Sequence, residues 1–278
     1  MIHFSQNELE SFILDDAPFG DLSTHLLDDR AKAKCVIYTR EDIILSCLDM
    51  VNNLARIYNL GFQSAFENKD FIKAGSEILS LDGDFKTLHL IYKSVQNLLE
   101  HACGIATKAF LMKKEAQSVN ENCQILVTRK IFPFSKKLCL KAALEGGAKV
   151  HRLGLSDSVL FFKTHFLAFE NENSFLQNIA KFKAELCERK IIVEAENLSF
   201  AKELLKYGVN GVQCDKMKVE ELENLVDFKK ANFKEAVILA AGGINEKNAK
   251  AYAKTGIDAI VTSSVYKGVA DLGASFCL

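Results

Sequence analysis

Residues 191–262 read IIVEAENLSFAKELLKYGVNGVQCDKMKVEELENLVDFKKANFKEAVILAAGGINEKNAKAYAKTGIDAIVT. Short apolar runs of strand-forming residues alternate there with segments of helical periodicity, and the same alternation begins further upstream. The predicted strands lie at 124–128, 158–162, 191–194, 211–214, 237–240 and 259–262. The predicted helices end near residues 145, 188, 207, 230 and 254. Such alternation is typical of parallel βα units.

Two architectures fit this pattern: an open, doubly wound sheet and a closed or partly closed α/β barrel. The positions of polar residues distinguish them. Six lie at or just beyond the carboxyl ends of four predicted strands: Arg129, Lys130, Glu194, Asp215, Gly242 and Gly243. An open sheet gathers such residues only where its strand order reverses, whereas a barrel builds its site from many converging loops. The sequence therefore favours a TIM-like barrel.

The chain before about residue 105 follows another pattern. A capped helix is expected near residues 5–14, strands near 35–39 and 71–79, and a helix at 48–60. Strands mixed with helices in this way predict an α+β domain. A long helical stretch over 85–119 contains Gly104, which is interpreted as a break or as a point of close packing.

Composition excludes several classes of protein. With 35 Lys and Arg against 36 Asp and Glu, the chain lacks the basic field of a nucleic-acid binder. No apolar run approaches the roughly 18 residues of a membrane span, and the first residues lack the layout of a signal peptide. The eight cysteines form no C-x-x-C pair, and we interpret them as reduced thiols. We therefore expect a cytoplasmic protein with no nucleic-acid or membrane partner.

Basic residues gather around two of the predicted strand ends. Arg129 and Lys130 follow one strand, His151 and Arg152 lie further on, and Lys136 falls between them. Each pair taken alone fits a solvated surface, and we expect Arg152 to face solvent. Together these cations would repel one another unless an anion neutralised them. The cluster predicts a site for a small, highly anionic molecule.

Two carboxylates and a double glycine complete the pattern. Glu194 and Asp215 end successive strands, 21 positions apart (215 minus 194), which is one βα repeat. They can share a Mg²⁺ ion with substrate oxygens, or each can pair with a nearby Lys or Arg. Gly242 and Gly243 lie between a strand and a helix, where backbone N–H groups can bind phosphate.

These features resemble a known family, the type II phosphoribosyltransferases typified by quinolinate phosphoribosyltransferase (nicotinate-nucleotide pyrophosphorylase). The motifs that carry the resemblance are DAPFGDLST at 16–24, QNLLE at 96–100, GIAT at 104–107 and GGI at 242–244. The resemblance implies an N-terminal sandwich domain, residues 1–105 joined by the tail 266–278, and a barrel of six or seven βα units, residues 106–265. It also implies 5-phosphoribosyl 1-pyrophosphate as donor with Mg²⁺, and a homodimer with sites at the subunit interface.

The resemblance assigns roles to single residues. It gives catalysis and metal binding to Glu194 and Asp215. Substrate binding falls to Lys93, Arg129, Lys130, His151, Arg152 and Phe162. Phosphate binding falls to Ala241, Gly242, Gly243, Thr262 and Ser263.

Three of these positions depart from the family pattern. Lys93 replaces an Arg that reaches the substrate across the dimer, Phe162 replaces a substrate-binding Lys, and Ala241 replaces a small hydroxyl residue. Lys163, displaced by one position, is expected to face the other way on the strand. These departures, with the wording HRLGLSD at 151–157, resemble the ModD group of pyrophosphorylases associated with molybdate-transport operons.

We therefore expect a phosphoribosyltransferase of the ModD type, acting on an acceptor less anionic than quinolinate. One alternative is quinolinate phosphoribosyltransferase itself, with Lys163 or Lys93 compensating for the missing charges. Another, from a different class, is a non-catalytic protein that binds a nucleotide or an oxyanion.

Overall fold

The computed structural model describes residues 2–27 and 31–277 of the chain. The chain folds into two compact units. Residues 1–110, 132–147 and 265–278 form the first unit, and residues 111–131 and 148–264 form the second. Each is described by itself. Within the described ranges, no helix combines the length and the apolar character that crossing a membrane requires.

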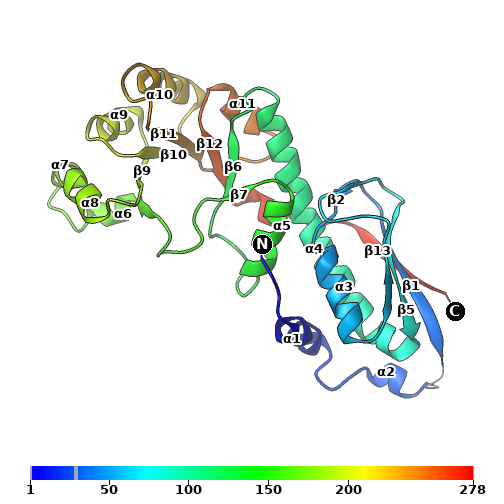
Figure 1. The fold of residues 1–278 in the computed structure, drawn as a ribbon. Helices are drawn as coiled ribbons and strands as arrows, with labels where there is room; N and C mark the ends of the chain where they lie inside the picture. Colours follow the sequence, from blue (N-terminus) through cyan, green and yellow to red (C-terminus); the bar gives the residue numbers. More distant parts are fainter. Residues whose placement is uncertain (1, 28–30, 278) are drawn as a thin grey trace. The chain divides into compact units, whose positions relative to one another are not determined.

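The second unit is built on a curved parallel sheet of seven strands in the order β7-β6-β12-β11-β10-β9-β8 (Figure 1). The strands are β6 (Gln124–Val127), β7 (Lys149–Val150), β8 (Val159–Phe161), β9 (Ile191–Ala195), β10 (Gly211–Asp215), β11 (Val237–Ala241) and β12 (Ala259–Thr262). All six pairings are parallel. The predicted α/β barrel is confirmed, as a half-barrel with β7 and β8 at its edges.

Helices follow the strands on the outside of this sheet. They are α6 (Lys163–Phe166), α7 (Glu172–Gln177), α8 (Ile179–Glu185), α9 (Leu198–Lys206), α10 (Val219–Asn232) and α11 (Ala249–Lys254). The single helix predicted for 172–188 is wrong, because α7 ends at Gln177 with Asn178 as its C-cap. The Asn178 side chain donates to the carbonyl of Ser174, and this local bond competes with continuation of the helix.

Alternate residues of the strands fill the inside of the half-barrel. One apolar cluster joins five strands: Leu160, Ile192, Leu239, Ala241, Ala259 and Val261, with Leu126, Phe162 and Val237 packed against it. Because side chains alternate along a strand, Glu194 shares the inward face of Ile192. The inward face of β9 therefore changes from apolar Ile192 to polar Glu194 toward its carboxyl end.

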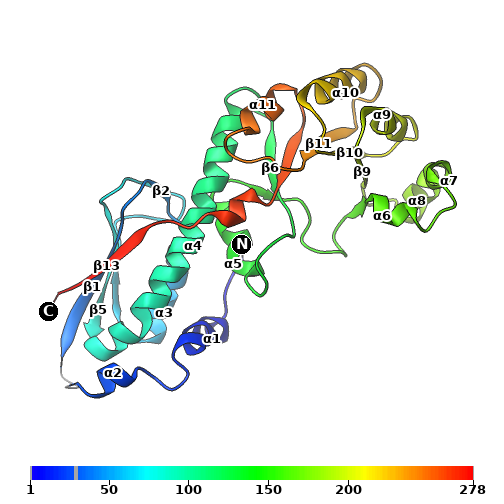
Figure 2. The same ribbon diagram turned by 180° about the vertical axis from the view of Figure 1, so that it is seen from behind.

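The first unit contains an antiparallel sheet in the order β13-β1-β5-β3 and a strand pair, β2-β4 (Figure 2). Its strands are β1 (Lys32–Thr39), β2 (Ile43–Ile44), β3 (Gly61–Gln63), β4 (Phe71–Ile72), β5 (Glu77–Asp84) and β13 (Leu272–Cys277). Its helices are α1 (Gln6–Asp16), α2 (Leu22–His25), α3 (Leu48–Ile57) and α5 (Lys136–Glu145), with a 3-10 turn, Ser264–Lys267, at the boundary. Through β13, the end of the chain pairs with β1.

The long helix α4 (Phe85–Gln117) is continuous, so Gly104 does not break it. A Cβ at Gly104 would lie 2.5 Å from the backbone of Gly268 and Val269. Gly268 has the reciprocal restriction, because a Cβ added there would collide with the carbonyl oxygen of Gly104. Of the two interpretations of Gly104, close packing is therefore the one observed.

Candidate active site

The two predicted catalytic carboxylates stand on neighbouring strands of the half-barrel. Glu194 on β9 pairs in register with Gln213 on β10, and Asp215 pairs with Ala241 on β11. Gln213 and Asp215 are two residues apart and so share a face of β10. The register brings Glu194, Asp215 and Ala241 to one edge of the sheet.

Asp215 is positioned by the glycine that follows β11. A Cβ on Gly242 would lie 2.7 Å from Asp215 Oδ1 and 2.5 Å from Lys216 Cγ, and the backbone there has a φ of +90°. Lys216, with a φ of 57°, donates its backbone N–H to the carbonyl of Ala241. The β10 and β11 ends are thus in direct contact, and this contact leaves no room for a side chain at residue 242.

The predicted phosphate loop is held by residues other than the glycines. The Thr262 hydroxyl, buried, donates to the carbonyl of Ile244, 2.8 Å away. Asn248 donates to the carbonyl of Gly243 and accepts from the N–H of Asn245. Gly243 is exposed, and a Cβ added to it would meet nothing within 4 Å.

The helix that follows the glycine loop begins at Ala249. The Asn245 and Asn248 side chains bond the loop backbone, and these local bonds delay the start of the helix. Any phosphate at Gly242 and Gly243 would therefore meet loop N–H groups. Ser263 follows Thr262 and is half-buried.

The four predicted cations of this unit follow two paired strands. Arg129 and Lys130 follow β6, and both are at least partly exposed. His151 follows β7, and its backbone N–H donates to the carbonyl of Val127 at the end of β6. Since β6 and β7 are parallel neighbours, the two pairs emerge at the same edge of the sheet.

Arg152 is buried, with 7% of its surface exposed, so the expectation that it faces solvent was wrong. Its Cζ lies 5.4 Å from the centre of the Phe162 ring, and no carboxylate within residues 2–27 and 31–277 forms an ion pair with it. Burial and the neighbouring charge of Arg129 lower the pKa of Arg152. A buried cation without a carboxylate is costly, and an anionic ligand would offset that cost.

Two side chains contact the Phe162 ring. The Arg152 guanidinium covers its ring at 5.4 Å, and the His165 imidazole stacks on it with centroids 5.6 Å apart and an interplanar angle of 22°. Lys163 forms an exposed ion pair with Glu196 at 3.1 Å. Phe162 packs inward against the barrel core as the N-cap of α6, and Lys163 points to the surface as the first residue of that helix and not as a strand residue.

Electrostatics connect the members of the site. Burial raises the pKa of Glu194, as do the charges of Asp215 and Glu196, while a hydrogen bond from Gln213 and the charge of Lys130 lower it. Burial, together with Arg152, lowers the pKa of His151 to about 4. His151 is therefore a neutral imidazole at physiological pH.

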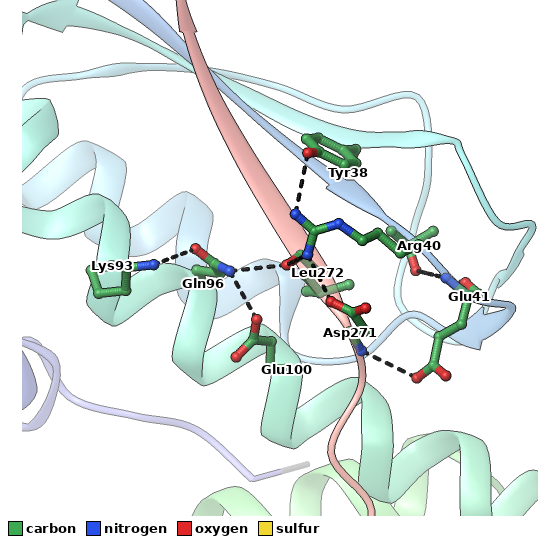
Figure 3. A network of polar contacts seen from close by, with 9 residues as sticks. Tyr38, Arg40, Glu41, Lys93, Gln96, Glu100, Asp271 and Leu272 are labelled. Atoms are coloured by element: carbon green, nitrogen blue, oxygen red, sulfur yellow. Dashed lines mark hydrogen bonds and ion pairs between the residues drawn. The ribbon is translucent and has the colours of Figure 1, made fainter.

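Lys93 belongs to the first unit, on α4, where it is exposed. Its ammonium donates to Gln96 Oε1 at 3.0 Å, and Gln96 in turn donates to Glu100 and to the carbonyl of Leu272 (Figure 3). Lys136, at the start of α5, lies in the first unit as well. Within the second unit, the cation cluster therefore contains Arg129, Lys130 and Arg152, with the neutral His151 beside them.

Sequence reasoning missed two residues. Gln213 is 5% exposed and donates to Glu194, and Lys216 is an exposed cation whose Nζ lies 3.9 Å from Asp215 Oδ2. Each has a sequence signal that could have found it. Gln213 is a polar residue two positions before the strand-end Asp215, and Lys216 is a basic residue directly after it. Neither signal is specific until register places it beside the carboxylates.

The carboxylates suit Mg²⁺ better than a fully protein-bound metal. Across the described ranges, no group of three or more His, Cys, Asp or Glu side chains could hold a metal ion. Mg²⁺ accepts one or two carboxylates and takes its other ligands from water and substrate phosphates. Glu194 and Asp215, both incompletely buried, fit that role.

A cavity of about 920 Å³ lies elsewhere, in the first unit. Its lining includes Leu48, Phe62 and Phe66, together with Lys141, which is ion-paired to Glu145 at 2.8 Å. It contains none of the predicted site residues.

Comparison with known proteins agrees with this geometry. The family model of the quinolinate phosphoribosyl transferase C-terminal domain matches residues 105–275, and that of the N-terminal domain matches residues 21–103. A protein of Pasteurella multocida that carries the name pyrophosphorylase ModD is 32% identical over 267 residues, 96% of this chain and 95% of its own. A Methanocaldococcus jannaschii protein named as a probable nicotinate-nucleotide pyrophosphorylase is 31% identical over 266 residues, 94% and 92% of the two chains.

Solved structures show the same fold. The nicotinate-nucleotide pyrophosphorylase of Ehrlichia chaffeensis superposes with a TM-score of 0.90 at 22% identity, over 99% of this chain and 100% of that one. Since the matched models cover both parts of the chain, the cation cluster, the carboxylate pair and the glycine loop lie within the family's C-terminal domain. The chain belongs to the quinolinate phosphoribosyl transferase family and is a phosphoribosyltransferase of its ModD-like pyrophosphorylase branch.

Proposed function

We propose that this enzyme transfers phosphoribose from 5-phosphoribosyl 1-pyrophosphate, with Mg²⁺, to a small planar acceptor that carries one acidic group. The buried guanidinium of Arg152 carries this proposal. It lies in the same unit as Arg129 and His151 and has no carboxylate partner among the described residues. An acid group on the acceptor would supply the missing charge.

The acceptor side of the pocket supports a singly charged acid. His151, with its pKa lowered to about 4, adds no positive charge at neutral pH. Phe162 occupies the position of the family's substrate-binding Lys, and both Arg152 and His165 lie against its ring. A second carboxylate, as in quinolinate, would meet an apolar side chain in place of a cation.

The chemistry follows from the placement of charge. When pyrophosphate leaves, the ribose carbon develops oxocarbenium character, which a nearby carboxylate stabilises. Glu194 or Asp215 would do this, while Lys130 and Lys216 neutralise the phosphates. Mg²⁺, when bound, would supply charge neutralisation on the departing pyrophosphate. A ring nitrogen of the acceptor can attack without a general base.

Arg152→Leu tests the proposal, because Leu keeps apolar contact with Phe162 and removes the charge. The probe is nicotinate mononucleotide, a product analogue with one carboxylate, measured by calorimetry. We expect an affinity loss of about 100-fold with the fold retained. Lys181→Glu, a change of an exposed cation on α8, is the matched control. Unchanged affinity in Arg152→Leu would show that the cluster is not the acceptor site.

Quinolinate remains a second candidate, favoured by the 31% identity to the Methanocaldococcus jannaschii protein. Incubation with quinolinate, donor and Mg²⁺ tests it by formation of nicotinate mononucleotide. We expect no turnover. Measurable turnover would contradict the role given to Phe162.

A non-catalytic anion binder would share the same pocket. Thermal-shift measurements with the donor plus Mg²⁺ and with molybdate separate the two functions. We expect stabilisation by the donor. A shift with molybdate alone would favour the binding protein.

Two further parts of the proposal concern assembly and location. We propose a homodimer in which the partner subunit's Lys93 completes the site, since Lys93 is an exposed cation on α4 and the family resemblance assigns it to the substrate across the dimer. We also propose a cytoplasmic location, supported by six buried cysteines with free thiols.

A further inference from the structure

Gln213 is a polar residue at an inward, buried position of the half-barrel. It is 5% exposed, and its register partners are Glu194 on β9 and Leu239 on β11. Leu239 belongs to the apolar cluster of the barrel interior. An apolar side chain would fit such surroundings better than an amide.

The amide is only half satisfied. Its Nε2 donates to Glu194 Oε2 at 2.7 Å, while its Oε1 is buried and has no hydrogen-bond partner among residues 2–27 and 31–277. The orientation is fixed, because turning the amide over would place Oε1 against a carboxylate oxygen. Leaving an acceptor buried and unpaired destabilises the fold.

The hydrogen bond to Glu194 explains why this residue is an amide. Asp215 and Glu196, which also influence Glu194, are carboxylates and cannot donate to it. Gln213 is the one hydrogen-bond donor to Glu194 in the part of the chain that the structure describes. It therefore decides which way the carboxylate of Glu194 is turned.

We propose that Gln213 is a positioning residue: it holds Oε2 of Glu194 so that the other carboxylate oxygen faces the ribose carbon on which positive charge develops. The proposal rests on the proposed phosphoribosyl transfer. The unpaired Oε1 of Gln213 then lowers the stability of the fold, and this loss is the consequence of holding Glu194 in that orientation.

Gln213→Met is the direct test, because Met has nearly the same length and lacks the amide group. Two probes are compared in the presence of Mg²⁺ and pyrophosphate: an iminoribitol 5-phosphate, whose ring nitrogen is cationic, and ribose 5-phosphate, which is uncharged at that position. We expect the variant to bind the cationic probe about tenfold more weakly, while ribose 5-phosphate changes by less than about twofold. The melting temperature should stay equal or rise, since an unpaired buried acceptor is removed.

Cys214→Ala is the matched control. Cys214 is 1% exposed on the same strand but faces the other side of the sheet. This variant should lower the melting temperature and leave the ratio of the two affinities unchanged.

A double-mutant cycle tests whether Gln213 acts through Glu194. In a Glu194→Gln background, Gln213→Met should cause no further loss of affinity for the cationic probe. Additive losses would overturn the proposal.

Three other results also overturn it. Equal losses for both probes would indicate a general distortion of the site. A fall in melting temperature with full affinity would indicate that Oε1 is satisfied by a structural water. Unchanged affinity for both probes would show that Gln213 has no role in positioning Glu194. If the wild-type protein binds neither probe nor the donor, the proposed function itself fails, which is a distinguishable outcome.

Discussion

At the scale of single residues, the site is marked by buried polar groups that lack ordinary partners. Arg152 is buried against an aromatic ring, and Gln213 keeps an unpaired acceptor in the barrel interior. Natural cores rarely retain such groups unless a ligand or a reaction uses them. Both residues lie in the unit that carries Glu194 and Asp215. The buried, incompletely paired side chains of Arg152 and Gln213 therefore help to locate the site, as the contacts between its other residues do.

His151 predicts a pH dependence of stability. Its pKa in the folded protein is about 4, against an ordinary value of 6.5. Below pH 6.5 the unfolded chain binds a proton that the folded chain does not, so stability is full above pH 6.5 and falls toward pH 4. Wild type should lose about 2 kcal/mol more than His151→Gln between about pH 7 and pH 5, measured by urea unfolding. Parallel curves for the two proteins would contradict the low pKa.

Phe162→Lys predicts a change of specificity. A Lys at this position would restore the cation that the family resemblance predicts there. Its ammonium would lie near the Arg152 guanidinium, so a second acid group on the acceptor is needed to offset the repulsion between the two cations. We expect the variant to bind quinolinate about tenfold more tightly than wild type does. Phe162→Leu is the control, since it removes the ring without adding charge. Equal quinolinate affinity in all three proteins would show that residue 162 does not select the acceptor.

At the scale of elements, the carboxyl ends of β10 and β11 pack directly against each other. Gly242 lets Asp215 and Lys216 approach the loop, and the Thr262 hydroxyl holds Ile244 from the next strand. Since the loop is fixed by side-chain bonds to its own backbone, its N–H groups are oriented before any phosphate arrives. This arrangement favours binding without a large ordering cost.

Gly242→Ala should disrupt that junction. The added Cβ would meet Asp215 and Lys216 at 2.5 to 2.9 Å, in a backbone region that Ala rarely adopts. We expect a loss of about 1–3 kcal/mol in unfolding free energy and weaker donor binding. Gly243→Ala is the informative comparison, because its φ of +75° brings backbone strain but its Cβ has open space. Equal losses of donor affinity in Gly242→Ala and Gly243→Ala would show that backbone strain, and not the clash with Asp215 and Lys216, causes the effect.

Lys216→Ala should weaken donor binding with little effect on stability. The side chain is 78% exposed, and its distance of 3.9 Å from Asp215 makes a weak ion pair. We expect a loss of about tenfold in affinity for the donor, and a smaller loss at high salt, measured by calorimetry at two ionic strengths. An unchanged affinity would place Lys216 outside the donor site.

At the scale of the whole molecule, the chain combines two units that the sequence interleaves. Residues 132–147 interrupt the second unit to contribute α5 to the first, and the last residues return to the first sheet as β13. The proposed dimer belongs to this scale, because Lys93 lies outside the unit that carries the acceptor cations.

Sedimentation and mixing experiments test the dimer. We expect the wild-type protein to sediment as a dimer. Mixed dimers of Lys93→Ala and Arg152→Leu should recover one intact site, provided that subunits exchange. Homodimers of either variant should have none. Absence of recovery in a verified mixed dimer would contradict a shared site.

The sequence by itself determined the order of strands and helices and the chemistry available at the strand ends. The spacing of apolar residues reflects which side chains are buried in a strand or a helix. The strands, the barrel class and the strand-end positions of Glu194 and Asp215 were therefore predictable. The continuous 172–188 helix was wrong, because the Asn178 side chain competes locally with helix formation.

Tertiary structure alone decided which groups are buried together. The burial of Arg152 against Phe162, the contact of Gly242 with Asp215, and the half-satisfied amide of Gln213 all depend on strand register. Register joins residues that are far apart in the chain, and a one-residue shift would turn each side chain to the opposite face. Sequence determined which charges are present, and packing decided which of them lack a partner.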